Sequence, residues 1–172
     1  MAIGEILDTS WREIFSVQKQ SYREDLLEEV DVLKGRWRVS PDTCFVFKGR
    51  DNSVLGYILA YPWKLNNPPK LSDNLTELFS ETKNVSDPFV ANTLYLHDLA
   101  VSTDARGLGV GKQLINKILK VAKLQNFKRI MLVAVDGADS FWFNFGFREV
   151  ERDFSCPTYG DDAKLMTLQL TT

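Results

Sequence analysis

The spacing of apolar residues predicts helices near the start of the chain and strands after them. From Trp11 to Leu33, apolar side chains recur at three- and four-residue steps between acids, lysines and arginines. This spacing is typical of amphipathic helices and predicts two short ones in that range. Two runs rich in β-branched and aromatic residues, 43–47 and 54–61, flank the turn-rich segment 49–53. Together they predict a β-hairpin.

The second half of the chain alternates strands with helices. Residues 93–101 and 129–135 are almost continuously apolar, as buried strands are. Between them, 110–124 carries its apolar residues on one helical face and lysines on the other. A short aromatic helix over 138–145 and strands over 147–150 and 164–170 complete the set of predicted elements. The order of elements indicates a central sheet with a parallel, right-handed crossover.

Residues 64–92 have weak patterning apart from a possible helical turn over Leu75 to Phe79. A connection this long inside a compact domain is usually functional or disordered. With Tyr61, Trp63 and Phe79 in or near it, we expect this segment to cover a substrate site.

Composition and charge narrow the class of protein. The 172 residues predict a single domain spanning 1–172, and 44% hydrophobic with 26% charged residues is ordinary for a globular chain. The 21 Lys and Arg nearly balance the 23 Asp and Glu, so no basic field exists to attract nucleic acid. No run of 18 apolar residues and no basic, apolar leader occurs, which disfavours membrane spanning and secretion. Cys44 and Cys156 form no CxxC pair, so we expect reduced thiols, no metal and a cytoplasmic location.

A glycine-rich turn, 106–112, lies between a predicted strand and a predicted helix. Backbone N–H groups gather at a helix N-terminus and make an anion site, although a plain flexible turn is the alternative. Gln113 follows Gly111-Lys112, so the hydroxyl of a phosphate-binding P-loop is missing. The third glycine of a dinucleotide fingerprint is missing as well, because Lys112 or Leu114 stands there.

The pattern Arg106-x-x-Gly109-x-Gly111, preceded by Leu99-Ala100-Val101, resembles the GNAT superfamily of N-acetyltransferases. The aromatic segment 141–147, which ends in Gly-Phe, is a second landmark of that family. The resemblance covers 93–150 and implies an α/β fold (α+β in some schemes). Its mixed, mostly antiparallel sheet would have about six to seven strands, with helices at its sides and a splayed parallel pair at the acetyl-CoA site.

The resemblance also implies which residues hold acetyl-CoA. Strand residues would contact the acetyl group and pantetheine arm, and the glycine turn would hold the pyrophosphate. The residues implied are Leu99, Ala100, Val101, Arg106, Gly107, Leu108, Gly109, Val110, Gly111, Lys112 and Trp142.

Residues 96–101 and 133–142 look like the arylalkylamine (serotonin-type) N-acetyltransferases, in which a histidine on this strand helps to deprotonate the amine. His97, the only histidine, falls on that position, and its ordinary pKa near 6.5 suits proton removal. A histidine with a purely structural role is the alternative. Asp98 is a second candidate, but neighbouring strand residues face opposite sides unless a bulge intervenes.

Trp142 stands where the family often has a tyrosine that protonates the CoA thiolate, and an indole N–H cannot do so near neutral pH. Either the thiolate leaves without an acid, or another group such as Tyr159 serves, or activity is weak.

We therefore expect an enzyme that passes an acetyl group from acetyl-CoA directly to the amine of a small molecule in a ternary complex. The slight acidic surplus suits a cationic amine. We expect no nucleic-acid or membrane partner, and a monomer or homodimer. The alternatives are a protein or peptide N-acetyltransferase and a CoA-binding module without catalysis.

Overall fold

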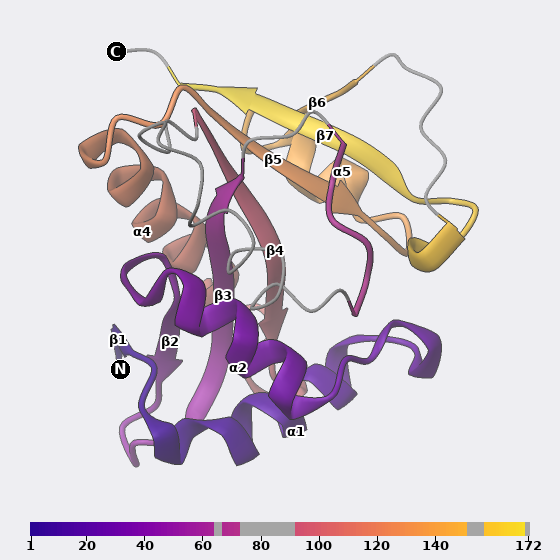
Figure 1. Cartoon of the computed structure of the whole chain (residues 1–172). Helices are drawn as coiled ribbons and strands as arrows, with labels where there is room; N and C mark the ends of the chain where they lie inside the picture. The colour runs from indigo at the N-terminus through magenta and orange to yellow at the C-terminus, as the bar shows by residue number, and fades with distance from the viewer. Residues whose placement is uncertain (64–66, 73–91, 151–156, 171–172) are drawn as a thin grey trace, which may run out of the picture.

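A seven-stranded sheet runs through the molecule (Figure 1). The computed structural model describes residues 1–63, 67–72, 92–150 and 157–170. In chain order the strands are β1 (Ala2–Glu5), β2 (Phe45–Lys48), β3 (Val54–Trp63), β4 (Thr93–Val101), β5 (Arg129–Ala134), β6 (Arg148–Glu149) and β7 (Lys164–Gln169). Their order across the sheet is β1-β2-β3-β4-β5-β7-β6, and every neighbouring pair is antiparallel except β4 and β5.

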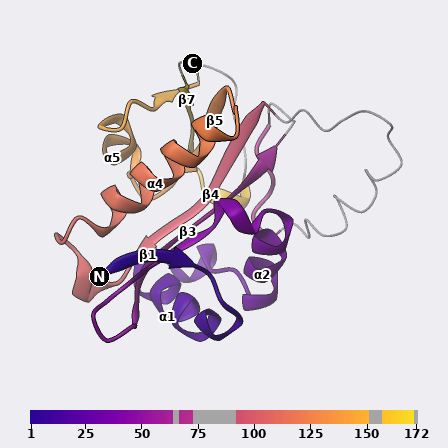
Figure 2. The same cartoon turned by 90° about the vertical axis from the view of Figure 1, so that its left-hand side faces the viewer.

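Helices cover both faces of the sheet. Figure 2 shows α1 (Trp11–Ser21) and α2 (Val30–Val39) on one side, with α4 (Val110–Leu124) and α5 (Asp139–Phe143) on the other. Each face has its own buried core, because strand residues alternate between the two sides. Ile14 and Leu33 belong to the first core, and Leu114 and Ile118 to the second. This two-sided burial fixes β3 and β4 at the centre of the fold.

The parallel pair is short and splayed. β4 and β5 pair only over Thr93–Tyr95 and Arg129–Met131, after which both strands continue without pairing to each other. The remaining part of β4 keeps β3 on one edge and leaves its other edge open. This confirms the expected fold class, including the splayed pair.

A β-bulge interrupts β4 at the start of its open part. Leu59 is opposite Asp98 and Ala60 is opposite Leu96, so His97 has no partner in the register. A bulge bends the strand and re-aims the side chains beside it.

The predicted helices and strands agree best with the structure in the elements whose apolar residues are buried throughout. The strand over 93–101 and the helix over 110–124 have the predicted bounds. The prediction of two helices within 11–33 is wrong for the second one, since α2 runs over 30–39. That helix buries a charged residue, Arg36, so its apolar spacing is poor beyond Leu33. The four-residue edge strand β1 was not predicted.

Several expectations concern other parts of the chain. The helical turn over 75–79, most of the 64–92 segment and Cys156 lie outside the described residues. Cys44 is buried, and burial raises its pKa to about 12, so the thiol stays protonated. Among the helices that the structure describes, none is long and apolar enough to cross a bilayer.

Gly56, in β3, lies close to both β4 and the first turn of α4. A Cβ there would lie 2.9 Å from Val110 Cγ1 and 3.0 Å from the Ala100 carbonyl oxygen. We expect Gly56→Ala to lower the free energy of unfolding by about 1–3 kcal/mol, because the packed core cannot yield to it. Gly4→Ala is the matched control, since nothing lies within 4 Å of a Cβ at Gly4. Urea unfolding of both variants measures the difference, and equal stability of the two would contradict this account.

Candidate functional site

The glycine turn before α4 presents unpaired amides. Gly107 and Gly109 have φ of 80° and 73°, a left-handed conformation that favours glycine. Gly109 caps α4, and the first helical hydrogen bond runs from Gln113 N to Gly109 O at 3.0 Å. The N–H groups of residues 110–112 are therefore free for an anion. Arg106 and Lys112 are exposed in the same turn, so it combines free amides with two cations.

The open edge of β4 exposes the backbone of alternate residues. Ser102 N donates to Leu55 O at 2.9 Å, so Ser102, and by alternation Ala100, faces β3. Leu99 and Val101 consequently face the gap left by β5. Of the three strand residues implied for acetyl-CoA, only these two offer backbone groups to a ligand.

Two hydroxyl groups from the end of α1 reach this open edge. Ser21 Oγ lies 3.2 Å from Val101 O, and Tyr22 Oη lies 2.9 Å from Leu99 O. They occupy the carbonyl groups there while leaving the N–H groups of the same strand residues available.

A cavity of about 280 Å³ runs along the open edge of β4 to α5. Its lining is mostly apolar, with polar groups from the α1 end and from β4. The lining residues are Ser21, Tyr22, Leu96, His97, Leu99, Leu132, Val133, Val135, Asp136, Ala138, Phe141 and Trp142. A mostly apolar cavity beside a strand edge with free N–H groups is a setting in which an extended apolar ligand can bind. Trp142 is buried in its wall, stacked edge-on against Phe141 and Phe147.

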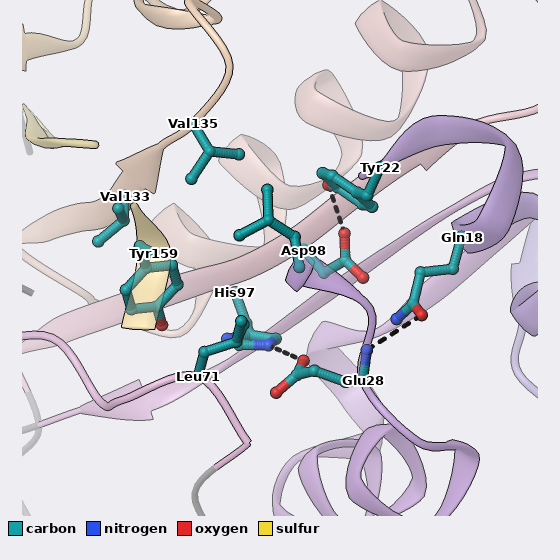
Figure 3. A pocket seen from close by; sticks show the side chains of 10 residues that line it. Gln18, Tyr22, Glu28, Leu71, His97, Asp98, Val133, Val135 and Tyr159 are labelled. Carbon is teal, nitrogen blue, oxygen red and sulfur yellow. Dashed lines mark hydrogen bonds and ion pairs between the residues drawn. The ribbon is translucent and has the colours of Figure 1, made fainter. Parts of the chain in front are cut away.

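A second, smaller cavity of about 50 Å³ lies on the α1 and α2 side of β4 (Figure 3). It is lined by Gln18, Tyr22, Leu26, Glu28, Leu71, His97, Asp98, Val133, Val135 and Tyr159. Tyr22, His97, Val133 and Val135 line both cavities. The two cavities therefore lie on either side of Tyr22 and His97.

His97 is part of a buried chain of polar groups. Its Nε2 lies 2.5 Å from Glu28 Oε2, and the other carboxylate oxygen accepts from an Arg36 Nη at 2.5 Å and from Ser72 N at 2.8 Å. Arg36 also donates to Tyr61 Oη at 3.1 Å, and that hydroxyl lies 3.5 Å from His97 Nδ1. The side chains of Arg36 and Glu28 are 0% and 2% exposed, so this ion pair has no access to bulk water.

Opposing effects set the charge of Glu28. Burial raises its pKa, but the charges and hydrogen bonds of His97 and Arg36 outweigh burial and hold the pKa well below its usual range. Glu28 is therefore an anion in the folded protein. It holds His97 Nε2 and leaves Nδ1 as the ring nitrogen that could accept a proton.

Asp98 lies in a different environment. Tyr22 Oη is 2.6 Å from its Oδ1 and Tyr57 Oη is 2.5 Å from its Oδ2. Burial raises the pKa of Asp98, although the charge of His97 and the two tyrosine hydrogen bonds act in the opposite direction. Burial, the largest effect, raises the pKa of both tyrosines.

The structure brings the three predicted catalytic residues together. His97, Asp98 and Tyr159 all line the smaller cavity, and the bulge at His97 is what allows two neighbouring strand residues to do so. Tyr159 lies on the side away from the larger cavity, where its hydroxyl donates to Pro69 O at 2.8 Å and meets Tyr95 Oη at 3.1 Å.

Sequence reasoning missed Tyr22, Glu28 and Arg36. Their only signal was that polar residues interrupt the apolar spacing in this part of the chain. In the described part of the chain, no group of three or more His, Cys, Asp or Glu side chains is placed to hold a metal ion.

Known proteins share this fold and part of this sequence. The sequence model of the acetyltransferase (GNAT) family matches residues 5–147. No curated protein matches the chain by sequence.

Solved structures extend the likeness to the whole chain. The GNAT-like decarboxylase GphF, solved with isobutyryl-CoA, has a TM-score of 0.78 at 15% identity, covering 99% of this chain and 100% of that one. A GNAT-family acetyltransferase from Staphylococcus aureus Mu50 has a TM-score of 0.69 at 20% identity, with 99% of both chains covered. The ribosomal-protein-S18-alanine N-acetyltransferase from Escherichia coli has a TM-score of 0.68 at 11% identity, covering 99% and 94%. At such identities the likeness shows the fold.

The buried pair of Arg36 and Glu28 makes a stability prediction. We expect Arg36→Met to cost about 3–5 kcal/mol of unfolding free energy, because Glu28 would keep a buried charge with one cation fewer. The lowered pKa of Glu28 means that its stabilisation is present above the ordinary glutamate pKa of about 4.3 and is lost as pH falls. The deficit of the variant should therefore be larger at about pH 7 than at about pH 4, where Glu28 can take a proton.

Arg38→Met is the control for this measurement, because Arg38 lies on the same helix but is exposed. We expect it to change stability by less than about 0.5 kcal/mol. Urea unfolding at both pH values measures the difference. Equal losses of stability in the two variants would contradict this account.

Proposed function

The chain belongs to the acetyltransferase (GNAT) family, and from that premise we propose that it transfers the acetyl group of acetyl-CoA directly to the amine of a small molecule in a ternary complex. The observation that carries this proposal is the meeting of the two cavities at Tyr22 and His97. Two bound substrates would face each other there without a covalent enzyme intermediate.

The larger cavity and the glycine turn supply the acetyl-CoA half of the proposed site. The free amides of 110–112 and the cations Arg106 and Lys112 would bind the pyrophosphate. The N–H groups of Leu99 and Val101 would bind the pantetheine arm and the acetyl oxygen. A backbone N–H aimed at that oxygen stabilises the charge that develops on it in the transition state.

His97 would accept the proton that the amine loses. Because Glu28 holds Nε2, the proton acceptor is Nδ1, where the Tyr61 hydroxyl is 3.5 Å away and only weakly bonded. The imidazolium that forms would be stabilised by the Glu28 carboxylate. This is the arrangement of a general base oriented by a buried acid.

The acceptor side supports a small amine. The smaller cavity holds only about 50 Å³, and Leu26 and Leu71 form part of its wall. Segment 67–72 is tied across it by the Tyr159 bond to Pro69, by Leu71 N to Thr158 Oγ1 at 3.2 Å, and by Ser72 N to Glu28. A peptide would need an open groove at this position. The cytoplasmic location expected from the two cysteines belongs to the same proposal.

Acetylation of a protein terminus or lysine is the second candidate, because a structure of similar fold is named for acting on ribosomal protein S18. The two candidates separate in one assay. We expect released CoA thiol with small amines such as phenethylamine and spermidine, and at least tenfold lower kcat/KM with peptides that have a free N-terminus or lysine. Turnover of peptides alone would overturn the choice of acceptor.

Acetyl-CoA binding provides the control for that assay, because it is expected with either acceptor. A ligand at about 100 times its Kd adds roughly 2.7 kcal/mol to the stability of the native state. A rise in Tm with acetyl-CoA, and none with an equal concentration of acetate, is the expected result. No rise at millimolar acetyl-CoA would count against the acetyl-CoA site itself.

Replacement of His97 tests the proposed base. We expect His97→Ala and His97→Gln each to lower kcat by about 10²–10⁴, the usual contribution of a general base. The acetyl-CoA-induced rise in Tm should stay the same. The amide introduced by His97→Gln can still donate to Glu28, so this variant removes the base while keeping a partner for the carboxylate. Wild-type kcat in either variant would remove His97 from the mechanism.

A further inference from the structure

The hydroxyl of Tyr22 has one hydrogen and two acceptors. Its oxygen lies 2.6 Å from Asp98 Oδ1 and 2.9 Å from Leu99 O, both within hydrogen-bond range. A phenol donates one hydrogen, so it cannot satisfy an ionised carboxylate and a carbonyl at the same time. A proton on Asp98 resolves the conflict. The acid then donates to Tyr22, Tyr22 donates to Leu99 O, and Tyr57 donates to the other Asp98 oxygen.

The surroundings of Asp98 agree with a neutral acid. Its hydrogen-bond partners are two tyrosines, Tyr22 from the link after α1 and Tyr57 from β3. The ionisable groups that act on it from other positions are His97 on its own strand and Glu28 before α2, and Glu28 is already an anion. Burial, the largest effect, raises the pKa of Asp98, and the charge of Glu28 raises it further, while His97 lowers it.

The hydroxyl of Tyr22 stands at the point where acyl transfer would occur. It contacts the carbonyl of Leu99, which faces the open edge of β4, and the side chain lines both cavities. Figure 3 shows this hydroxyl pointing toward the carboxyl group of Asp98. Tyr22 therefore lies between the thioester arm and the amine in the proposed complex.

Other side chains in the larger cavity are poorer proton donors for a thiolate. Trp142 has an indole N–H that does not ionise near neutral pH. Asp136 is already engaged in an ion pair with Arg23 at 3.1 Å. The Ser21 hydroxyl is an aliphatic alcohol and already faces two carbonyl groups, Val17 O and Val101 O. With His97 assigned to the amine, Tyr22 is the remaining donor among the described residues that line this cavity.

We propose that Tyr22 is a catalytic residue that protonates the departing CoA thiolate, and that Asp98 resupplies the proton. As the amine nitrogen bonds to the acetyl carbon, its proton passes to His97. The carbon–sulfur bond then breaks with its electron pair on sulfur, which takes the Tyr22 proton while the Asp98 proton moves to Tyr22. His97 then releases its proton to solvent, and Asp98 takes up a proton from solvent. This inference rests on the proposed acetyl transfer and adds the missing acid to it.

Tyr22→Phe tests the inference while preserving the ring. We expect kcat for acetyl transfer to phenethylamine, or to whichever panel amine is turned over, to fall by at least about 10². KM for acetyl-CoA should change less than about threefold. Tyr57→Phe is the matched control, because Tyr57 touches the same carboxyl group but lines neither cavity. Its kcat should stay within about tenfold of the wild type. Equal losses in the two variants, or none in Tyr22→Phe, would contradict the assignment.

Asp98→Asn tests the resupply of the proton. An amide can donate to Tyr22 and accept from Tyr57 as the neutral acid does, so we expect native stability and acetyl-CoA binding. Its kcat should fall as in Tyr22→Phe. The wild-type pH profile should lose kcat on the alkaline side as Asp98 ionises, and this limb should be missing in Asp98→Asn. An unchanged alkaline limb would show that Asp98 has only a structural role.

A spectroscopic measurement decides the resting state without any acceptor. The infrared spectrum of the free protein at neutral pH should contain a protonated-carboxyl C=O band that is missing in Asp98→Asn and retained in Tyr57→Phe. An absent band in the wild type would overturn the inference. Failure to turn over any amine would instead count against the proposed function, and the band would still report the proton that the inference requires.

Discussion

The separation of β4 from β5 is the constraint on which the rest of the site depends. A strand edge inside a domain leaves N–H and C=O groups without partners, and such groups are costly unless something satisfies them. Here the hydroxyls of Ser21 and Tyr22 contact carbonyls, and a cavity occupies the remaining space. The same strand leads through residues 102–105 into the glycine turn, so the open strand edge and the free amides before α4 belong to one continuous segment.

The bulge at His97 places two neighbouring residues of β4 at one cavity, and buried charges surround them there. Neighbouring residues of a regular strand face opposite sides, yet His97 and Asp98 both reach one cavity. The two carboxyl groups beside them have opposite environments. Glu28 is held as an anion by a cation and an imidazole, and Asp98 is surrounded by phenols. Two acids whose pKa values are pushed apart in this way are suited to different roles in one proton-transfer sequence.

Much of the fold could be predicted because its central elements are continuously apolar. The strand over 93–101 and the helix over 110–124 were predicted with the right bounds, and the glycine turn between them followed from its spacing. The position of α2 could not be predicted, since Arg36 is buried by an ion pair that becomes possible only after Glu28 has folded beside it. His97 and Asp98 were predicted as candidates, but the bulge that unites them has no sequence signature. Tyr22 was missed because its role depends on a contact 77 positions away along the chain.

The hydrogen bond from Ser72 N to Glu28 connects segment 67–72, which lies beside the smaller cavity, to the charge network beneath it. Three groups donate hydrogen bonds to this carboxylate, from Arg36, His97 and Ser72. Ser72 N is the one that belongs to segment 67–72. The contacts of Glu28 therefore reach from segment 67–72 through Arg36 to Tyr61 on β3 and, through His97, to β4. One buried carboxylate thus connects segment 67–72, α2, β3 and β4, so loss of its charge would loosen four parts of the fold at once.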